Sequence, residues 1–284
     1  MKEHARQTRV EGRIVGLVPT MGALHEGHLS LIKRAKQDCA PVIASLFVNP
    51  KQFGPKEDFA NYPRSFEEDV KKFTAAGVEG LFAPELAEVY PPGFCTYVNV
   101  DGLSERLEGR SRPGHFRGVA TVVLKLLEIV QPHFAYFGRK DAQQARVIQQ
   151  MAHDLNVDTE IVVCPIVREP DGLALSSRNA YLNAEERRAA TVLYRALDAA
   201  RREMTAGVRD ALQLQAAMRK VLDSEPLAGV DYAEIVDANT FEPVNQMRRS
   251  CYALLAVFIG KTRLIDNLLI ERTGADSEEL LFQL

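Results

Sequence analysis

Residues 14–28 read IVGLVPTMGALHEGH, and this stretch sets the fold of the chain. The apolar run from Ile14 to Val18 is typical of a buried strand, and a short loop follows it. A helical pattern starts near Glu26 and continues from Leu29 to Lys36. A strand that leads through a loop into a helix is the first half of a βαβ unit, which predicts a parallel sheet.

The same alternation continues to about residue 164. Further strands are expected at residues 42–48, 80–83, 96–100, 134–137 and 160–164, and helices at 65–76, 119–130 and 142–155. Ser65 and Glu68 are spaced as in a capping box. The predicted fold class is therefore α/β, with a Rossmann-like parallel sheet and helices on both faces. A G-x-G-x-x-G dinucleotide fingerprint is absent from the sequence.

After Pro165 the order of elements changes, because helices now precede strands. Asn183 and Glu186 can cap a helix that runs to about Thr205, and a second helix is expected at residues 208–224. Strands are expected at residues 232–236, 251–259 and 263–269. This order predicts a smaller C-terminal α+β domain. A charged turn at residues 168–172 places the boundary, which gives domains at residues 1–168 and 169–284.

Composition excludes several classes of protein. The 284 residues are 46% hydrophobic and carry a net charge of −3, so a sizeable core is expected and a nucleic-acid or membrane-surface partner is not. The four cysteines are far apart and form no C-x-x-C, which disfavours a zinc site or a redox pair and favours free thiols. Neither a signal-peptide pattern nor an apolar run of about 20 residues is present, so we expect a soluble, cytoplasmic protein.

The first candidate site is the H-x-G-H stretch that opens the helix at Glu26. Open parallel sheets bind ligands at the carboxyl ends of their strands, and a helix N-terminus there offers N–H groups to an anion. His25 and His28 can point to one side of the first turn and donate hydrogen bonds to phosphate, while Gly27 permits close approach. The competing interpretation is a helix start with two surface histidines. A metal site is disfavoured because no third ligand lies nearby in the sequence.

Two further clusters point to a phosphate ligand. Lys140, Asp141 and Gln144 follow the strand at residues 134–137, where Lys140 offers a charge for phosphate and Asp141 can either bind a ribose hydroxyl or cap the next helix. The alternative is a capped helix with an exposed lysine. The segment Ser176-Ser177-Arg178-Asn179 can clamp polyphosphate oxygens, or it can be an ordinary polar turn.

Taken together, these motifs resemble those of the pantothenate synthetase (pantoate–β-alanine ligase) family, which belongs to the HIGH-motif nucleotidyltransferases related to class I aminoacyl-tRNA synthetases. The matching segments are PTMGALHEGH (19–28), FVNPKQF (47–53), YPR (62–64), HFRGV (115–119) through Leu126, FG (137–138), KD (140–141), QQ (143–144), VRE (167–169) and DGLA (171–174) through Asn179. The resemblance implies condensation of (R)-pantoate with β-alanine through a pantoyl-adenylate, with ATP converted to AMP and diphosphate. It also implies a Mg²⁺ requirement and a homodimer.

The resemblance also implies roles for individual residues. As catalytic groups it implies His25, His28, Lys140 and Arg178. The implied ATP-binding set is Met21, Gly27, His28, Gly138, Lys140, Asp141, Val167, Leu175, Ser176, Ser177 and Arg178, where Gly138 and Asp141 face the ribose and residues 176–178 hold the outer phosphates. Pantoate is assigned to Gln52 and Gln144 with Met21 beside it, and Asn49 and Tyr62 lie near the β-alanine cleft. No protein side chain is expected to bind the metal directly.

The sequence departs from the family pattern at three positions near these motifs. Arg139 stands where members usually carry Glu, Ala142 where an aromatic is common, and Leu175 where Met is frequent. Arg139 adds positive charge beside the nucleotide loop.

Three other functions compete with this one. Another nucleotidyltransferase is disfavoured by Gln52 and Gln144, because two amides suit a neutral polyol acid. A tRNA-binding module is disfavoured by the acidic net charge. A non-catalytic ATP-binding protein would not need the two histidines, and both are present.

Overall fold

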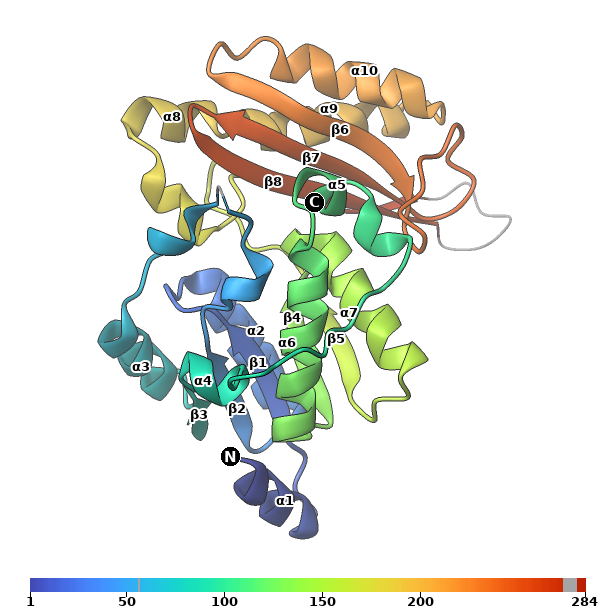
Figure 1. Cartoon of the computed structure of the whole chain (residues 1–284). Coiled ribbons are helices and arrows are strands. Elements are labelled where there is room, and N and C mark those ends of the chain that lie inside the picture. Colours follow the sequence, from blue (N-terminus) through green and yellow to red (C-terminus); the bar gives the residue numbers. More distant parts are fainter. Residues whose placement is uncertain (56, 273–279) are drawn as a thin grey trace. The chain divides into compact units, whose positions relative to one another are not determined.

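The computed structural model describes residues 1–55, 57–272 and 280–284 (Figure 1). The chain divides into two compact units, Met1–Cys164 and Pro165–Leu284. The sequence placed a domain boundary slightly later, after residue 168.

The first unit is built on a five-stranded parallel sheet in the order β3-β2-β1-β4-β5. The strands are β1 (Gly16–Thr20), β2 (Val42–Leu46), β3 (Gly80–Phe82), β4 (Phe134–Gly138) and β5 (Glu160–Cys164). The central strand β1 is apolar because both of its faces are covered, and Leu17 and Val18 are fully buried. The predicted α/β fold is confirmed.

The chain adds β2 and β3 on one side of β1 and then returns to add β4 and β5 on the other side. This change of direction determines which face of the sheet each helix covers. Right-handed crossovers place α2 (Glu26–Asp38) and α3 (Phe66–Ala75) on one face and α6 (His115–Val130) and α7 (Ala142–Asp154) on the other (Figure 1). The remaining elements are shorter: α1 (Lys2–Val10), α4 (Leu86–Val89), α5 (Glu108–Ser111), η1 (Pro50–Gln52), η2 (Asp58–Ala60), η3 (Leu103–Glu105) and η4 (Arg139–Asp141).

Two expectations for this unit were wrong. Residues 96–100, all of them described, form no strand. They pack on α6 instead, where the Val98 N–H donates to Thr121 Oγ1 at 2.9 Å and the Arg117 guanidinium lies 4.0 Å from the centre of the Tyr97 ring. The second error is the capping box of α3. Ser65 is the N-cap, but its hydroxyl donates to Asp69 Oδ2 at 3.2 Å instead of accepting from the helix backbone.

The second unit is α+β, as predicted. Its antiparallel sheet has the order β6-β7-β8-β9, with β6 (Ala228–Asp237), β7 (Cys251–Ile259), β8 (Thr262–Arg272) and β9 (Leu280–Gln283). Its helical elements are η5 (Ser177–Tyr181), α8 (Ala184–Ala189), α9 (Val192–Thr205) and α10 (Ala211–Leu222). Apolar faces of α9 and α10 pack on the sheet through Leu193, Leu197, Met218 and Leu255.

The Asn183 cap is confirmed, since Asn183 Oδ1 accepts the N–H groups of Glu185 and Glu186 and the Glu186 carboxylate accepts the Asn183 N–H. The single helix expected after it is divided into α8 and α9 near residue 190. Strand β9 was not predicted.

All four cysteines lie within the described residues and are free thiols. Cys39, Cys164 and Cys251 are buried and Cys95 is exposed. Of the helices that the structure describes, none is long and apolar enough to cross a membrane.

Gly118 allows α6 to lie directly against the η1 turn. Its carbonyl accepts from Asn49 Nδ2 at 3.1 Å, and a Cβ at this position would lie 2.2 Å from the Lys51 carbonyl oxygen. Because that obstacle is backbone, a larger side chain can be accommodated only if the η1 turn moves.

We therefore expect Gly118→Ala to lower the free energy of unfolding by about 1–3 kcal/mol, measured by urea denaturation. Gly54→Ala is the matched control, because the nearest atom to a Cβ there is the end of the flexible Glu57 side chain at 3.4 Å. Equal stability of the two variants would show that the η1 turn can shift freely.

Candidate active site

The loop after β1 turns sharply before α2 begins. Gly22 has a φ of 91° and Ala23 a φ of 50°, so two successive residues lie in the left-handed region. This turn brings His25 to the N-cap position of α2.

His25 and His28 form a reciprocal cap at the N-terminus of α2. His25 Nδ1 accepts the Gly27 N–H at 3.2 Å, and His28 Nδ1 accepts the His25 N–H at 3.3 Å. The two ring centroids are 4.1 Å apart. Since both Nδ1 atoms accept, the proton of each neutral ring is assigned to Nε2. Each imidazole therefore has an Nε2–H group for hydrogen bonding beyond the cap.

Both imidazoles are neutral at physiological pH. Burial lowers the pKa of His25 to about 3, with further contributions from His28, Lys140 and Lys72. Burial lowers the pKa of His28 to about 4, again assisted by Lys140 and Lys72. The pair thus supplies hydrogen-bond donors, whereas the positive charge of the site comes from the lysines.

The second cluster lies at the same edge of the sheet as the histidines. β4 pairs in parallel with β1, so the η4 turn that carries Lys140 and Asp141 and the loop that carries His25 follow neighbouring strands. Asp141 is the N-cap of α7 but makes no side-chain cap hydrogen bond. Two roles were expected for the Asp141 side chain, ribose binding and helix capping. The structure does not show the capping role. A Cβ at Gly138 would meet no atom within 4 Å, so the chain is open at this point.

Gln52 is held in one orientation by its neighbours. Its Oε1 accepts from Asn49 Nδ2 at 3.1 Å, and its Nε2 lies 3.1 Å from Met21 Sδ. Asn49 is only 1% exposed, and its Oδ1 accepts from the Tyr90 hydroxyl at 2.8 Å and from the Lys51 N–H at 3.2 Å. Asn49 thus fixes which end of the Gln52 amide is available as a donor.

The adjacent glutamines of α7 differ in their surroundings. Gln143 is buried, and its Nε2 donates to the carbonyls of Leu103 and Arg106, both at 2.8 Å, while its Oε1 accepts the Glu108 N–H at 3.1 Å. Gln144 is half-buried. The structure therefore gives Gln143 a role in holding the segment at residues 103–108.

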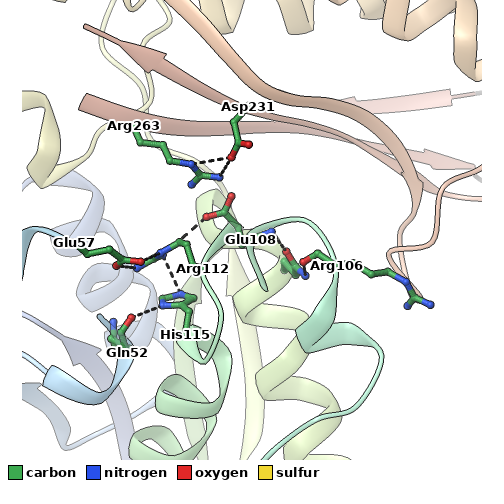
Figure 2. A network of polar contacts seen from close by, with 9 residues as sticks. Gln52, Glu57, Arg106, Glu108, Arg112, His115, Asp231 and Arg263 are labelled. Carbon is green, nitrogen blue, oxygen red and sulfur yellow. Dashed lines mark hydrogen bonds and ion pairs between the residues drawn. The ribbon is translucent and has the colours of Figure 1, made fainter. Parts of the chain in front are cut away.

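Sequence reasoning missed an ionic network that supports the Gln52 turn (Figure 2). Arg112 forms a two-pronged pair with the Glu57 carboxylate at 2.9 and 2.7 Å, and its Nη1 lies 3.2 Å from His115 Nε2. His115 Nδ1 is 2.8 Å from the carbonyl oxygen of Gln52. A carbonyl can only accept, so Nδ1 carries the proton and Nε2 accepts from Arg112. His115 and Arg112 were not chosen as site residues because nothing in the sequence shows what they contact.

Tyr62 is 5% exposed, and its ring lies edge-on to Phe53, with centroids 5.8 Å apart. Its place near a β-alanine cleft stays a prediction, as does that of Asn49.

In the second unit, Ser176 is the N-cap of η5 and its hydroxyl accepts the Arg178 N–H at 3.2 Å. The strand-like segments on either side of the turn at residues 169–172 pair with each other, since the Leu175 N–H donates to the Val167 carbonyl at 3.0 Å. Arg168 anchors this turn through a two-pronged pair with the buried Asp266 at 2.7 and 2.9 Å. Ser176, Ser177 and Arg178 are thus placed at the start of a short helical turn by a braced segment.

Protonation of the buried histidines opposes folding. Burial lowers the pKa of His115 to about 4, as it lowers those of His25 and His28. A histidine with a lowered pKa binds fewer protons when folded than when unfolded, so its contribution is complete above about pH 6.5 and is lost as the pH falls toward 4.

We expect His115→Gln to reduce the free energy of unfolding at pH 7 by about 1–3 kcal/mol, because Arg112 and the Gln52 carbonyl lose a buried partner. From pH 6.5 to 4, its stability should fall less steeply than that of the unmodified chain, as measured by urea denaturation at a series of pH values. His153→Gln, at an exposed position, is the control. Parallel curves for His115→Gln and the unmodified chain would contradict the assignment.

Comparison with known proteins shows the family of the chain. The model of the pantoate-beta-alanine ligase family matches residues 1–269. A pantothenate synthetase of Roseiflexus castenholzii is 57% identical over 257 residues, which cover 90% of this chain and 92% of that protein.

Two crystal structures are also similar. The pantothenate synthetase of Thermus thermophilus has a TM-score of 0.88 at 47% identity, covering 93% of this chain and 96% of that one. The pantoate-beta-alanine ligase of Francisella tularensis, solved with beta-gamma ATP and beta-alanine, has a TM-score of 0.75 at 36% identity and covers 94% of this chain and 95% of that one. The chain therefore belongs to the pantoate–β-alanine ligase family.

Proposed function

We propose that this chain condenses (R)-pantoate with β-alanine at the expense of ATP, through a pantoyl-adenylate, and releases pantothenate, AMP and diphosphate. The observation that carries the proposal is the reciprocal cap of His25 and His28, which leaves the Nε2–H group of each neutral ring for a ligand. The charge of Lys140 acts on both rings.

In the first step, a carboxylate oxygen of pantoate attacks the α-phosphorus of ATP, and diphosphate leaves. No protein nucleophile is required, so the enzyme contributes positioning and stabilisation of charge. Negative charge that develops on the phosphate oxygens is met by the Nε2–H groups of His25 and His28 and by the Lys140 ammonium. The neutral imidazoles donate hydrogen bonds in this step and keep their protons, so they do not act as general acids.

In the second step, the amine of β-alanine attacks the acyl carbon of the mixed anhydride and AMP leaves. Gln52 and Gln144 hold pantoate through hydrogen bonds, with Met21 alongside. The fixed orientation of Gln52 supports this role, because its Nε2 is left as the donating end. Asn49 and Tyr62 line the approach of β-alanine in this proposal.

The nucleotide contacts complete the scheme. Gly27, Gly138, Asp141, Val167 and Leu175 contact the adenosine part and its ribose, and Ser176, Ser177 and Arg178 bind the outer phosphates. Support comes from the uncommitted Asp141 side chain at the N-cap of α7 and from the braced turn that precedes Ser176. We accordingly assign residues 1–168 to nucleotide and pantoate binding and residues 169–284 to a lid.

Mg²⁺ enters this scheme with ATP as part of the substrate. The side chains nearest the proposed phosphate position are imidazole and ammonium donors, which suit phosphate oxygens and not a hard cation. Within the described part of the chain, no group of three or more His, Cys, Asp or Glu is placed to hold a metal ion. We propose that the metal is held by phosphate oxygens and water.

The family also leads us to propose a homodimer in the cytoplasm. The four free thiols support the location, since unpaired cysteines are typical of reducing compartments.

The reaction and the role of His28 can be tested together. The chain is incubated with ATP, Mg²⁺ and pantoate, with and without β-alanine, and AMP release is measured. Sustained AMP release only with both small substrates is expected. His28→Ala should slow single-turnover adenylation by about 10²–10³-fold, because the lost donor acts on transition-state charge. Lys33→Ala, exposed on the same helix, is the control. Near-normal turnover of His28→Ala would remove this residue from the mechanism.

The two glutamines of α7 offer a second test. Gln144→Ala should weaken pantoate binding roughly ten-fold with ATP binding little changed, as measured by calorimetry with a non-hydrolysable ATP analogue. Gln143→Ala should instead lower the free energy of unfolding, because three backbone groups lose their partner. Equal loss of pantoate and ATP affinity in Gln144→Ala would contradict the assignment.

A further inference from the structure

A buried carboxylate on α3 binds the loop that precedes His25. Asp69 is fully buried; its Oδ2 accepts the Ala23 N–H at 2.9 Å and its Oδ1 accepts the Leu24 N–H at 2.8 Å. These amides belong to the sharp turn at Gly22 and Ala23, where a strand-like hydrogen-bond pattern is not available to them. Asp69 therefore supplies the partners that this backbone conformation requires.

Lys72 binds the same loop from the next turn of α3. Its Nζ donates to the Leu24 carbonyl at 2.7 Å. Residues three apart on a helix face the same side, so Asp69 and Lys72 approach the loop together. Both backbone groups of Leu24 are consequently held by α3, and Leu24 is the residue directly before His25.

We propose that Asp69 and Lys72 are positioning residues of the phosphate site: by fixing Leu24 they set the place of the His25–His28 pair at the start of α2. The proposal rests on the phosphate role proposed above for the two histidines. Neither residue is required to touch ATP or pantoate.

The charges around the pair are consistent with a role for Lys72 beyond packing. His25 is faced by His28 on its own helix, by Lys140 and Asp141 on the η4 turn, and by Lys72 on α3. His28 is faced by Lys140 and Lys72. The Asp69 carboxylate accepts from the Ala23 and Leu24 N–H groups and from the Ser65 hydroxyl. Burial is the main reason why the pKa values of both imidazoles are low, and the Lys72 ammonium lowers them further.

The test uses Lys72→Met in the full chain, because methionine preserves the length and helix propensity of the side chain but cannot donate. We expect the single-turnover rate of adenylation to fall roughly ten-fold with the KM for pantoate unchanged, since the loss lies in donor placement. We also expect the pKa values of His25 and His28, followed by NMR of the ring protons, to rise. Lys72→Arg should restore part of the rate, and Lys71→Met, at an exposed neighbouring position, is the matched control.

Asp69→Asn is the second variant, since its amide can accept only one of the two loop N–H groups, and hydrogen exchange at Leu24 should accelerate. If Lys72→Met matches Lys71→Met both in rate and in histidine pKa, the positioning role is overturned while the proposed reaction stands. If the unmodified chain releases no AMP, the proposed reaction fails, and the histidine pKa values together with Leu24 exchange still decide whether the α3 contacts hold the pair.

Discussion

Each imidazole at the start of α2 uses its Nδ1 to accept a backbone N–H, and this leaves only Nε2 for a ligand. A helix N-terminus normally offers its own amides to an anion. Here two of those amides are consumed by His25 and His28, and the rings extend the donor set outward. Two backbone N–H groups at the helix end thus have partners within the fold, and in the proposed site the donors to phosphate are side chains in a fixed tautomer.

In this arrangement the two histidines provide hydrogen-bond donors, and the nearby lysines provide the positive charge. A buried imidazolium would be costly in the absence of nucleotide, and the nearby lysines make it more so. Neutral rings avoid that cost and still donate. In the proposed site, Lys140 would provide the electrostatic attraction for phosphate. The same logic recurs at His115, where burial and, to a lesser extent, Arg112 lower the pKa of the imidazole, and the neutral ring donates to the Gln52 carbonyl.

The sequence was sufficient for the five strands of the parallel sheet and for the edge of that sheet at which the candidate site residues meet. Apolar runs such as Ile14 to Val18 report burial directly, and loops that follow parallel strands must meet at one edge. It could not predict the histidine cap, because histidine is not among the usual N-cap residues. Nor could it predict the contacts of Gln143 with the segment at residues 103–108, since these depend on which way the side chain faces in the folded chain.

The errors have a similar origin. The run at residues 96–100 has strand-like composition, but pairing requires a neighbouring strand, and that is a property of the tertiary structure. Asp69 reads as an ordinary acidic residue of a surface helix. Its burial follows from the left-handed turn at Gly22 and Ala23, which brings unpaired amides against α3.

The Asn49–Gln52 contact carries a stereochemical consequence once Gln52 is taken as a ligand of pantoate. A freely rotating amide can exchange its oxygen and nitrogen ends, and so can serve either mirror image of a hydroxy acid. Asn49 removes that freedom, because its own amide is committed to Gly118, Tyr90 and the Lys51 backbone and cannot turn to suit a different partner. A bound acid must then offer an acceptor at one defined point. In the proposed site, this point adds to those set by Gln144 and by the carboxylate that attacks ATP, which gives the three points that discrimination between enantiomers requires. Chiral discrimination would thus depend on Asn49, a residue to which no contact with pantoate is assigned.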